Sequence, residues 1–296
     1  MTIAACYPSS EGIVFGSDST ATMFVRGRGN QLGSEHYYTF CQKVFEFGEQ
    51  GSSVGMVMWG LGALSSLSYR TLVSETADTA RKRNISLLED VAKLWAEKFW
   101  VEYVQSFQEL FPRIKELEEK NESRTTEENN ELQYWKMNLS GGFCLGGRWG
   151  ESRRPAAFEI LYNPLLDSEP KPKLLVNGNP RFWGCPNLID RLALGIDPGL
   201  FRAILESDKW IGSHEDLFEL ISRGVLGVPQ DLPIREAIDL VYAKIYTTIK
   251  TMKFSHLSPV CGGPIEIAVI TSDRPFRWVC HKSLCEAITE GNYLEG

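Results

Sequence analysis

Three residues early in the sequence carry the groups needed for nucleophilic catalysis: Thr2, Asp18 and Lys43. If Met1 is removed, Thr2 has a free α-amine beside its own Oγ, and that amine can act as general base for the hydroxyl. A nearby ammonium lowers the pKa of an amine and stabilises negative charge that develops on a substrate. A carboxylate would hold the lysine in place. The three residues therefore form a candidate catalytic set.

Two short strands are expected to bring Asp18 close to Thr2. Residues 2–7 and 12–17 predict two short strands on either side of a Pro-Ser-Ser-Glu turn, which would pair with each other. Residues 40–47 predict a third strand, which contains Lys43 among apolar neighbours, where a lysine must reach solvent or find a counter-charge. Each residue considered alone has a simpler interpretation without a catalytic role. Thr2 fits an ordinary strand residue, Asp18 fits a turn residue and Lys43 fits a surface residue.

The remaining sequence predicts further strands in blocks, separated by helices. Residues 26–38 are glycine-rich and predict a loop. Ser86 and Glu89 have the spacing of a capping box, which predicts that a helix starts at Ser86. The polar segment 113–133 fits a solvated helical extension, a mobile loop or a docking surface. The other predicted strands are 54–60, 139–147, 156–162, 173–178, 265–271 and 276–280, and the other predicted helices are 63–82, 86–111, 186–206, 214–224 and 233–252. Strands in blocks favour packed antiparallel sheets flanked by helices, an α+β fold.

Composition excludes several classes of protein. The 296 residues are 43% hydrophobic and 23% charged with a formal net charge of −7, and no dense Lys/Arg tract offers a surface for nucleic acid. No apolar stretch approaches the roughly 18 residues of a membrane span, and the first residues lack the features of a signal peptide. The seven cysteines are scattered without a C-x-x-C pair, which favours reduced thiols and a cytoplasmic location.

Other motifs carry less weight. Residues 51–55 spell G-x-S-x-G, but a strand and not a helix is expected to follow. Residues 27–32 nearly match the dinucleotide-binding motif G-x-G-x-x-G, but Leu32 stands where the motif needs its last glycine. The histidines lack zinc-ligand spacing, and a cluster of Cys280, His281 and Cys285 gives only a weak hint of a metal. The sequence therefore calls for no metal and no organic cofactor.

Several stretches together resemble the proteasome β-type N-terminal nucleophile (Ntn) hydrolases. They are the start T-I-A-A, the run G-I-V-F-G-S-D-S-T-A-T at 12–22, Lys43 with its apolar neighbours, W-G-L-G-A-L at 59–64, and S-P-V-C-G-G-P-I-E-I-A-V-I at 258–270 after a long helix. The Met-Thr start is similar to the bacterial members without a propeptide, namely the heat-shock peptidase HslV, the Anbu peptidase and the β-proteobacterial proteasome homologue.

The resemblance implies a four-layer αββα sandwich of two antiparallel sheets flanked by helices. It implies one domain over residues 1–296, with insertions at 26–38, 113–133 and around 205–230. Thr2 would be the nucleophile, Lys43 would tune its amine, Asp18 would orient Lys43, and the N–H of Gly60 would bind the oxyanion. The accessory residues would be Gly184, Cys185, Ser258 and Cys261. Ser258 and Cys261 depart from the family, which has Asp and Ser in these two places.

The resemblance also implies a function. We expect a self-compartmentalising threonine peptidase that hydrolyses amide bonds of a peptide or unfolded protein, built as a homo-oligomeric ring or stacked rings. Neither nucleic acid nor membrane is an expected partner, and an ATP-dependent unfoldase stays an open question. The alternative is a catalytically silent, ring-forming scaffold of the same fold, which retention of Met1 and the departures at Ser258 and Cys261 would favour.

Overall fold

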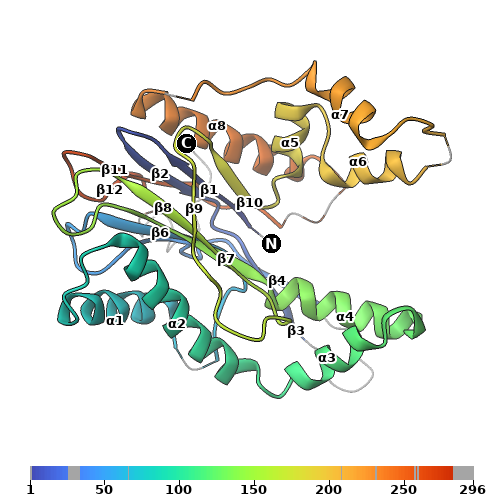
Figure 1. Ribbon diagram of the computed structural model, residues 1–296, viewed down its shortest axis with the longest axis horizontal. Helices are drawn as coiled ribbons and strands as arrows, with labels where there is room; N and C mark the ends of the chain where they lie inside the picture. Colours follow the sequence, from blue (N-terminus) through green and yellow to red (C-terminus); the bar gives the residue numbers. More distant parts are fainter. Residues whose placement is uncertain are drawn as a thin grey trace, which may run out of the picture.

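Two antiparallel sheets lie between helices, with α8 and α5 on one side and α1 and α2 on the other (Figure 1). The computed structural model describes residues 2–25, 34–65, 67–207, 209–230, 232–256, 258 and 260–282. The prediction of an α+β fold with antiparallel sheets is confirmed.

The first sheet contains the start of the chain. Its order is β10-β1-β2-β11-β12, and every neighbouring pair is antiparallel. Four of these strands were predicted, whereas β10 was not. It is a short edge strand between Pro180 and Pro186, and pairing with β1 defines it. The strands are β1 Ile3–Pro8, β2 Gly12–Ser17, β10 Arg181–Gly184, β11 Glu266–Thr271 and β12 Arg277–Cys280.

The second sheet has the order β5-β6-β7-β8-β9. The strand predicted at 40–47 is much shorter, so Lys43 lies just before β5 and not within it. The strand predicted at 173–178 is likewise reduced to two residues. The strands are β5 Val44–Glu46, β6 Val54–Gly60, β7 Gly141–Gly147, β8 Ala156–Tyr162 and β9 Lys173–Leu174.

A separate hairpin corrects the loop predicted at 26–38. Strand β3 (Ala21–Val25) pairs in antiparallel fashion with β4 (Ser34–Tyr38). The prediction was therefore wrong for residues 34–38, because the ladder with β3 holds this polar segment extended. Residues 26–33 lie outside the described part of the chain.

Two predicted helix starts were wrong. Helix α1 is Tyr69–Lys82 and begins where the Ser68 side chain accepts a hydrogen bond from the Thr71 N–H, six residues after the predicted start at 63. Helix α2 is Leu88–Phe107, and its N-cap residue Leu87 makes no side-chain capping bond. The expected cap at Ser86 is therefore not formed, and just before the helix the Ile85 carbonyl accepts a hydrogen bond from Nε1 of Trp149 at 2.7 Å.

The polar segment 113–133 belongs to a helical extension. It contains α3 (Phe111–Glu119), a 3₁₀ turn and most of α4 (Thr126–Leu139), so the loop alternative is wrong. Thr125 and Glu128 form a capping box at the start of α4. The two helices bury a small apolar cluster and exchange ion pairs across their faces, among them Arg113–Glu131, Lys120–Glu128 and Lys136–Glu118.

The later helices are α5 Asn187–Leu194, α6 Pro198–Leu205, α7 His214–Ser222 and α8 Ile234–Lys253, as predicted in outline. Helix α8 packs on β1, β2 and β11, and α2 packs on β7 and β8. A third apolar cluster joins the facing sides of the two sheets, with Phe15 and Ile270 from one and Val57 and Cys144 from the other. Burial of both faces explains why these strands read as continuous apolar runs.

Within the described residues, no helix combines the length and apolarity that crossing a membrane requires.

Candidate active site

Asp18 and Lys43 form a buried ion pair. The Nζ of Lys43 lies 2.6 Å from Oδ1 of Asp18, and only 5% and 0% of the two side chains are exposed. The same ammonium donates to the carbonyl oxygen of Thr20 at 2.5 Å. A buried charge is tolerated only when it is paired and hydrogen-bonded. Asp18 therefore supplies the counter-charge that was predicted for Lys43.

The carboxylate of Asp18 connects this ion pair to the start of the chain. Its Oδ1 also accepts a hydrogen bond from the Ile3 N–H at 3.1 Å. Its Oδ2 accepts from the N–H groups of Thr20 at 3.1 Å and Gly262 at 3.0 Å. These bonds orient the carboxylate from three separate segments of the chain. They bring the predicted Asp18–Lys43 pair next to Thr2, which is 4% exposed.

Gly184 allows strand β10 to lie directly against Thr2. It pairs with Ile3 and has a φ of +85°, and a Cβ here would lie 1.8 Å from the Thr2 carbonyl oxygen. Glycine avoids both the clash and the strain of positive φ. This strand was not predicted from the sequence, and its close approach to Thr2 is a property of the fold.

Cys185 and Cys261 meet beside Thr2. Both are buried in one apolar cluster that also contains Ile3, and neither forms a disulfide. The hydrogen bond from Cys261, together with one from the Thr2 backbone, lowers the pKa of Cys185. The same thiol contact, together with burial and the negative charge of Asp18, raises the pKa of Cys261. Two of the predicted accessory residues are thus brought together with Thr2 and Asp18.

Gly60 ends strand β6 next to the segment that carries Lys43. The Met58 N–H donates to the Lys43 carbonyl at 2.9 Å, and Trp59 stacks on Trp183 of β10 with ring centroids 4.2 Å apart. Gly60 itself has a φ of +86°, and a Cβ here would lie 2.2 Å from the carbonyl oxygen of Ser140, the residue before β7. Gly60 is therefore an exposed glycine that the fold requires, between segments that both flank the site.

Ser258 lies outside the buried cluster that contains Asp18, Lys43 and Cys261. It is exposed, and its carbonyl accepts a hydrogen bond from the Val260 N–H. Asp18, Lys43 and Cys261 are all buried. The turn therefore contributes to the buried cluster through Cys261 and through the Gly262 N–H that binds Asp18.

A second buried carboxylate, Glu266, was missed in the sequence. It is fully buried in β11, with its oxygens 2.9 Å from Nδ1 of His281 and 3.1 Å from Nζ of Lys282. Lys282 also donates to the Ser19 hydroxyl and the Cys41 carbonyl, and burial lowers its pKa. The sequence did contain a signal for this residue, because Glu266 is the one charged residue in the apolar run I-E-I-A-V-I at 265–270. Through Ser19, Cys41 and the Lys43 N–H, which donates to Glu266 at 3.5 Å, this network borders the Asp18–Lys43 pair.

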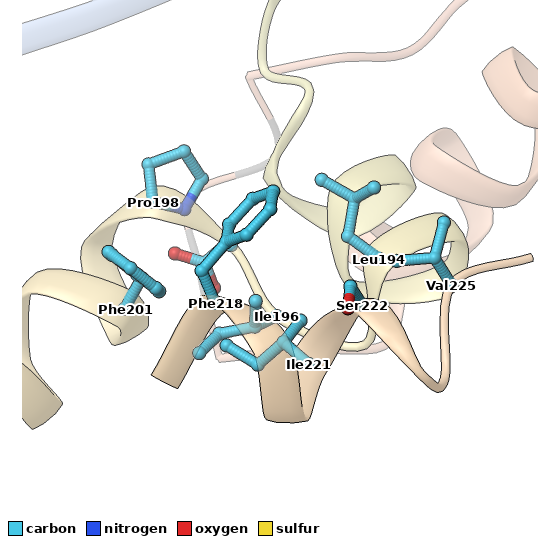
Figure 2. A pocket seen from close by; sticks show the side chains of 9 residues that line it. Leu194, Ile196, Pro198, Phe201, Phe218, Ile221, Ser222 and Val225 are labelled. Carbon is cyan, nitrogen blue, oxygen red and sulfur yellow. The ribbon is translucent and has the colours of Figure 1, made fainter. Parts of the chain in front are cut away.

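Helices α5, α6 and α7 enclose an apolar pocket of about 560 Å³. Figure 2 shows the side chains that surround it, with Phe201 from α6 and Phe218 from α7 among them. Asp197 is the acidic residue of the lining, and it caps α6 and pairs with Arg191. The pocket is formed by residues other than those around Thr2.

No metal centre is found in the described part of the chain, where no three His, Cys, Asp or Glu side chains are grouped to hold an ion. Cys285 of the weak metal hypothesis lies outside the described residues. His281 instead pairs with Glu266 and stacks on Trp278 with centroids 4.0 Å apart.

Solved structures that are similar to this chain include an Anbu protein. The Anbu (Gly-1) mutant from Hyphomicrobium sp. strain MC1 matches with 12% identity and a TM-score of 0.48, over 98% of this chain and 91% of that chain. No protein-family model matches the sequence, and no curated protein does. The function is therefore argued from the geometry around Thr2.

Proposed function

We propose that this protein is an N-terminal threonine amidohydrolase of the Ntn type, with Thr2 exposed by removal of Met1. One observation carries the proposal: a single oxygen of Asp18 accepts hydrogen bonds from both the Lys43 ammonium and the Ile3 N–H. The carboxylate therefore fixes a buried cation beside the residue that carries the nucleophile. An ordinary surface lysine would not be placed and neutralised in this way.

In the proposed reaction, Oγ of Thr2 attacks the carbonyl carbon of an amide and passes its proton to the α-amine. The Lys43 ammonium keeps this amine unprotonated near neutral pH and stabilises the developing oxyanion. The C–N bond then breaks, and the leaving amine takes the proton from the α-ammonium. Water hydrolyses the resulting ester of Thr2, with the α-amine again accepting the proton.

The remaining residues take supporting roles in this proposal. The Gly60 N–H donates to the oxyanion, since Gly60 ends strand β6, which is hydrogen-bonded to the segment that carries Lys43. Cys185, adjacent to Gly184, contacts the Thr2 backbone, so its sulfur orients the α-amine once Met1 has left. Cys261 supports Cys185, and Ser258 lies farther out on the same turn. The substrate runs as an extended peptide past the exposed end of β6 at Gly60.

We also propose an αββα arrangement in one domain, with the helices around 113–133 and 205–230 as additions to it. Core clusters on the outer face of each sheet and between the sheets support this arrangement. Homo-oligomeric rings that enclose the Thr2 sites would restrict the substrate to peptides or unfolded chains. A cytoplasmic location agrees with the several buried thiols that form no disulfide.

The first test is the intact mass of the purified native protein, followed by labelling with a peptide epoxyketone, which needs both Oγ and a free α-amine. We expect a chain that begins at Thr2 and one adduct on Thr2. Thr2→Ala should abolish the label while its unfolding transition stays close to that of the native protein. Thr2→Ser is the matched control, since it keeps both reacting groups.

Two results would contradict the proposal. Labelling of Thr2→Ala would place the reactive group elsewhere in the chain. Quantitative retention of Met1, with no peptide hydrolysis, would leave Thr2 without its base and would support the silent ring-forming scaffold.

A further inference from the structure

A cavity of about 340 Å³ lies between helix α8 and the segments next to β11 and β12. We propose that it is a binding site for a small aromatic carboxylate, a ligand of one or two flat rings with a single negative charge. The lining of the cavity includes none of Thr2, Asp18 and Lys43. The inference therefore does not rest on the proposed function.

One wall of the cavity is aromatic. Tyr242 and Tyr246 are one turn apart on α8, and their rings stack at an interplanar angle of 19° with centroids 6.0 Å apart. Both residues are exposed, at 41% and 45%. An exposed aromatic ring offers its face or edge to another flat ring, which stacks on it in an offset or edge-on arrangement. This wall therefore favours a planar, apolar group.

The charged groups in the lining are basic. They are Lys250, His281 and Lys282, and no acidic side chain lines the cavity in the described part of the chain. This excess is local, since the whole chain has a formal net charge of −7. Nζ of Lys250 lies 5.1 Å from the centroid of the Tyr246 ring, so a cation lies directly beside the aromatic wall. The cavity therefore combines a surface for a ring with a partner for an anion.

The hydrogen bonds of Lys282 limit the charge of the ligand. Its side chain is 10% exposed and its Nζ lies 3.1 Å from the buried carboxylate of Glu266, which neutralises it. The same ammonium donates to the Ser19 hydroxyl at 3.2 Å and to the Cys41 carbonyl at 2.7 Å, so all three of its protons have partners.

Lys250 is the cation that stays available to a ligand. It contacts the Tyr246 ring and forms no ion pair among the described residues. A carboxylate carries one negative charge, whereas a phosphate group carries about −1.5 to −2 at neutral pH. One uncompensated lysine therefore favours a carboxylate over a phosphate.

The volume and the apolar surface limit the size of the ligand. Small-molecule sites in proteins have volumes of about 300–1,000 Å³ and are mostly apolar with a few placed polar groups. This cavity lies near the lower limit, and Ile249, Pro264 and Ile265 add apolar surface to its lining. A carboxylate on one or two fused rings fits both properties.

Cys280 provides a reporter inside the chain, because it lines the cavity and its residue is exposed. The experiment titrates the full-length protein with naphthoate by calorimetry and measures the rate of alkylation by N-ethylmaleimide in peptide maps. We expect saturable binding and slower alkylation of Cys280 at saturation. Cys185, beside Thr2, is the control and should keep its rate, because the ligand binds elsewhere.

Two lysines on α8 provide a matched pair of variants. Lys250→Met removes the charge and keeps most of the side chain, so the dissociation constant for naphthoate should rise about 5-fold. Lys253→Met should leave it unchanged, since Lys253 lies over Phe254 and outside the lining. Naphthamide has the same rings without the charge. It should bind the native protein about 5-fold more weakly than naphthoate does, and Lys250→Met should remove this difference.

Several results would overturn the site. Absence of saturable naphthoate binding at millimolar concentrations overturns it, and so does protection of Cys185 in place of Cys280. Equal binding of naphthoate and naphthamide to the native protein, or equal effects of Lys250→Met and Lys253→Met, overturns the assigned ligand class. The proposed function is tested separately, because Thr2→Ala should bind naphthoate as the native protein does.

Discussion

Lys43 and Asp18 meet across the fold at 2.6 Å, with almost nothing of either side chain exposed. Residues from four segments converge on this pair, because Asp18 also binds the backbone of Ile3, Thr20 and Gly262. The arrangement connects the stability of the fold to the proposed chemistry. Removing one partner therefore has consequences for both.

Lys43→Ala leaves the Asp18 carboxylate buried without its cation. We expect the free energy of unfolding to fall by about 3–5 kcal/mol, because an unpaired buried charge costs far more than a lost surface pair. Urea unfolding measures the change. Lys93→Ala is the control, since Lys93 pairs with Glu89 in solvent and its loss should leave stability unchanged. Equal effects of the two substitutions would show that the Asp18–Lys43 pair is not buried.

Gly184→Ala places a methyl group against the Thr2 carbonyl oxygen. The variant should be destabilised and should lose labelling at Thr2, because β10 and β1 must move apart. Gly195→Ala is the matched control, with a φ of +78° and open space around its Cβ position. It should cost about 1–2 kcal/mol, from the left-handed backbone alone, and should keep its labelling. The interpretation fails if Gly184→Ala is the milder of the two in thermal unfolding.

Glu266→Gln removes the counter-charge of Lys282, whose side chain is 10% exposed. We expect a loss of stability that is partly restored when Lys282→Met is added, because the second change removes the unpaired ammonium. A double-mutant cycle in urea should give a coupling energy of about 0.5–3 kcal/mol. Strict additivity of the two single changes would show that the contact contributes nothing.

The lowered pKa of Cys185 predicts a distinct pH dependence of alkylation. Thiolate accumulates at a lower pH when the pKa falls, so the rate of iodoacetamide reaction at Cys185 should rise below the pH range of an ordinary cysteine. Cys261→Ala removes the principal hydrogen bond and should move this profile to higher pH. Peptide mapping across a pH series measures both profiles, and identical midpoints would contradict the assigned cause.

Local sequence signals predicted much of the fold. The turn between residues 7 and 12 predicted the β1–β2 pair, and the helical stripe after Pro233 predicted α8. Predictions failed where pairing with distant residues decides the local structure. Strand β4 is polar and β10 is four residues long, yet each forms a ladder with a partner strand. Helices α3 and α4 depended on contacts with each other that composition alone does not reveal.

The sequence by itself determined which chemical groups this protein has, and the resemblance to a known family assigned them to one candidate site. Thr2, Asp18 and Lys43 carry a nucleophile, a carboxylate and an ammonium wherever the chain places them. Only the tertiary structure decided that Asp18 binds three backbone N–H groups, that Cys185 and Cys261 share a buried cluster with Ile3, and that Glu266 neutralises Lys282. The physical reason is burial. A charge or thiol removed from water must find its partner inside the fold, and the partner is set by strand pairing and packing between residues that lie far apart in the chain.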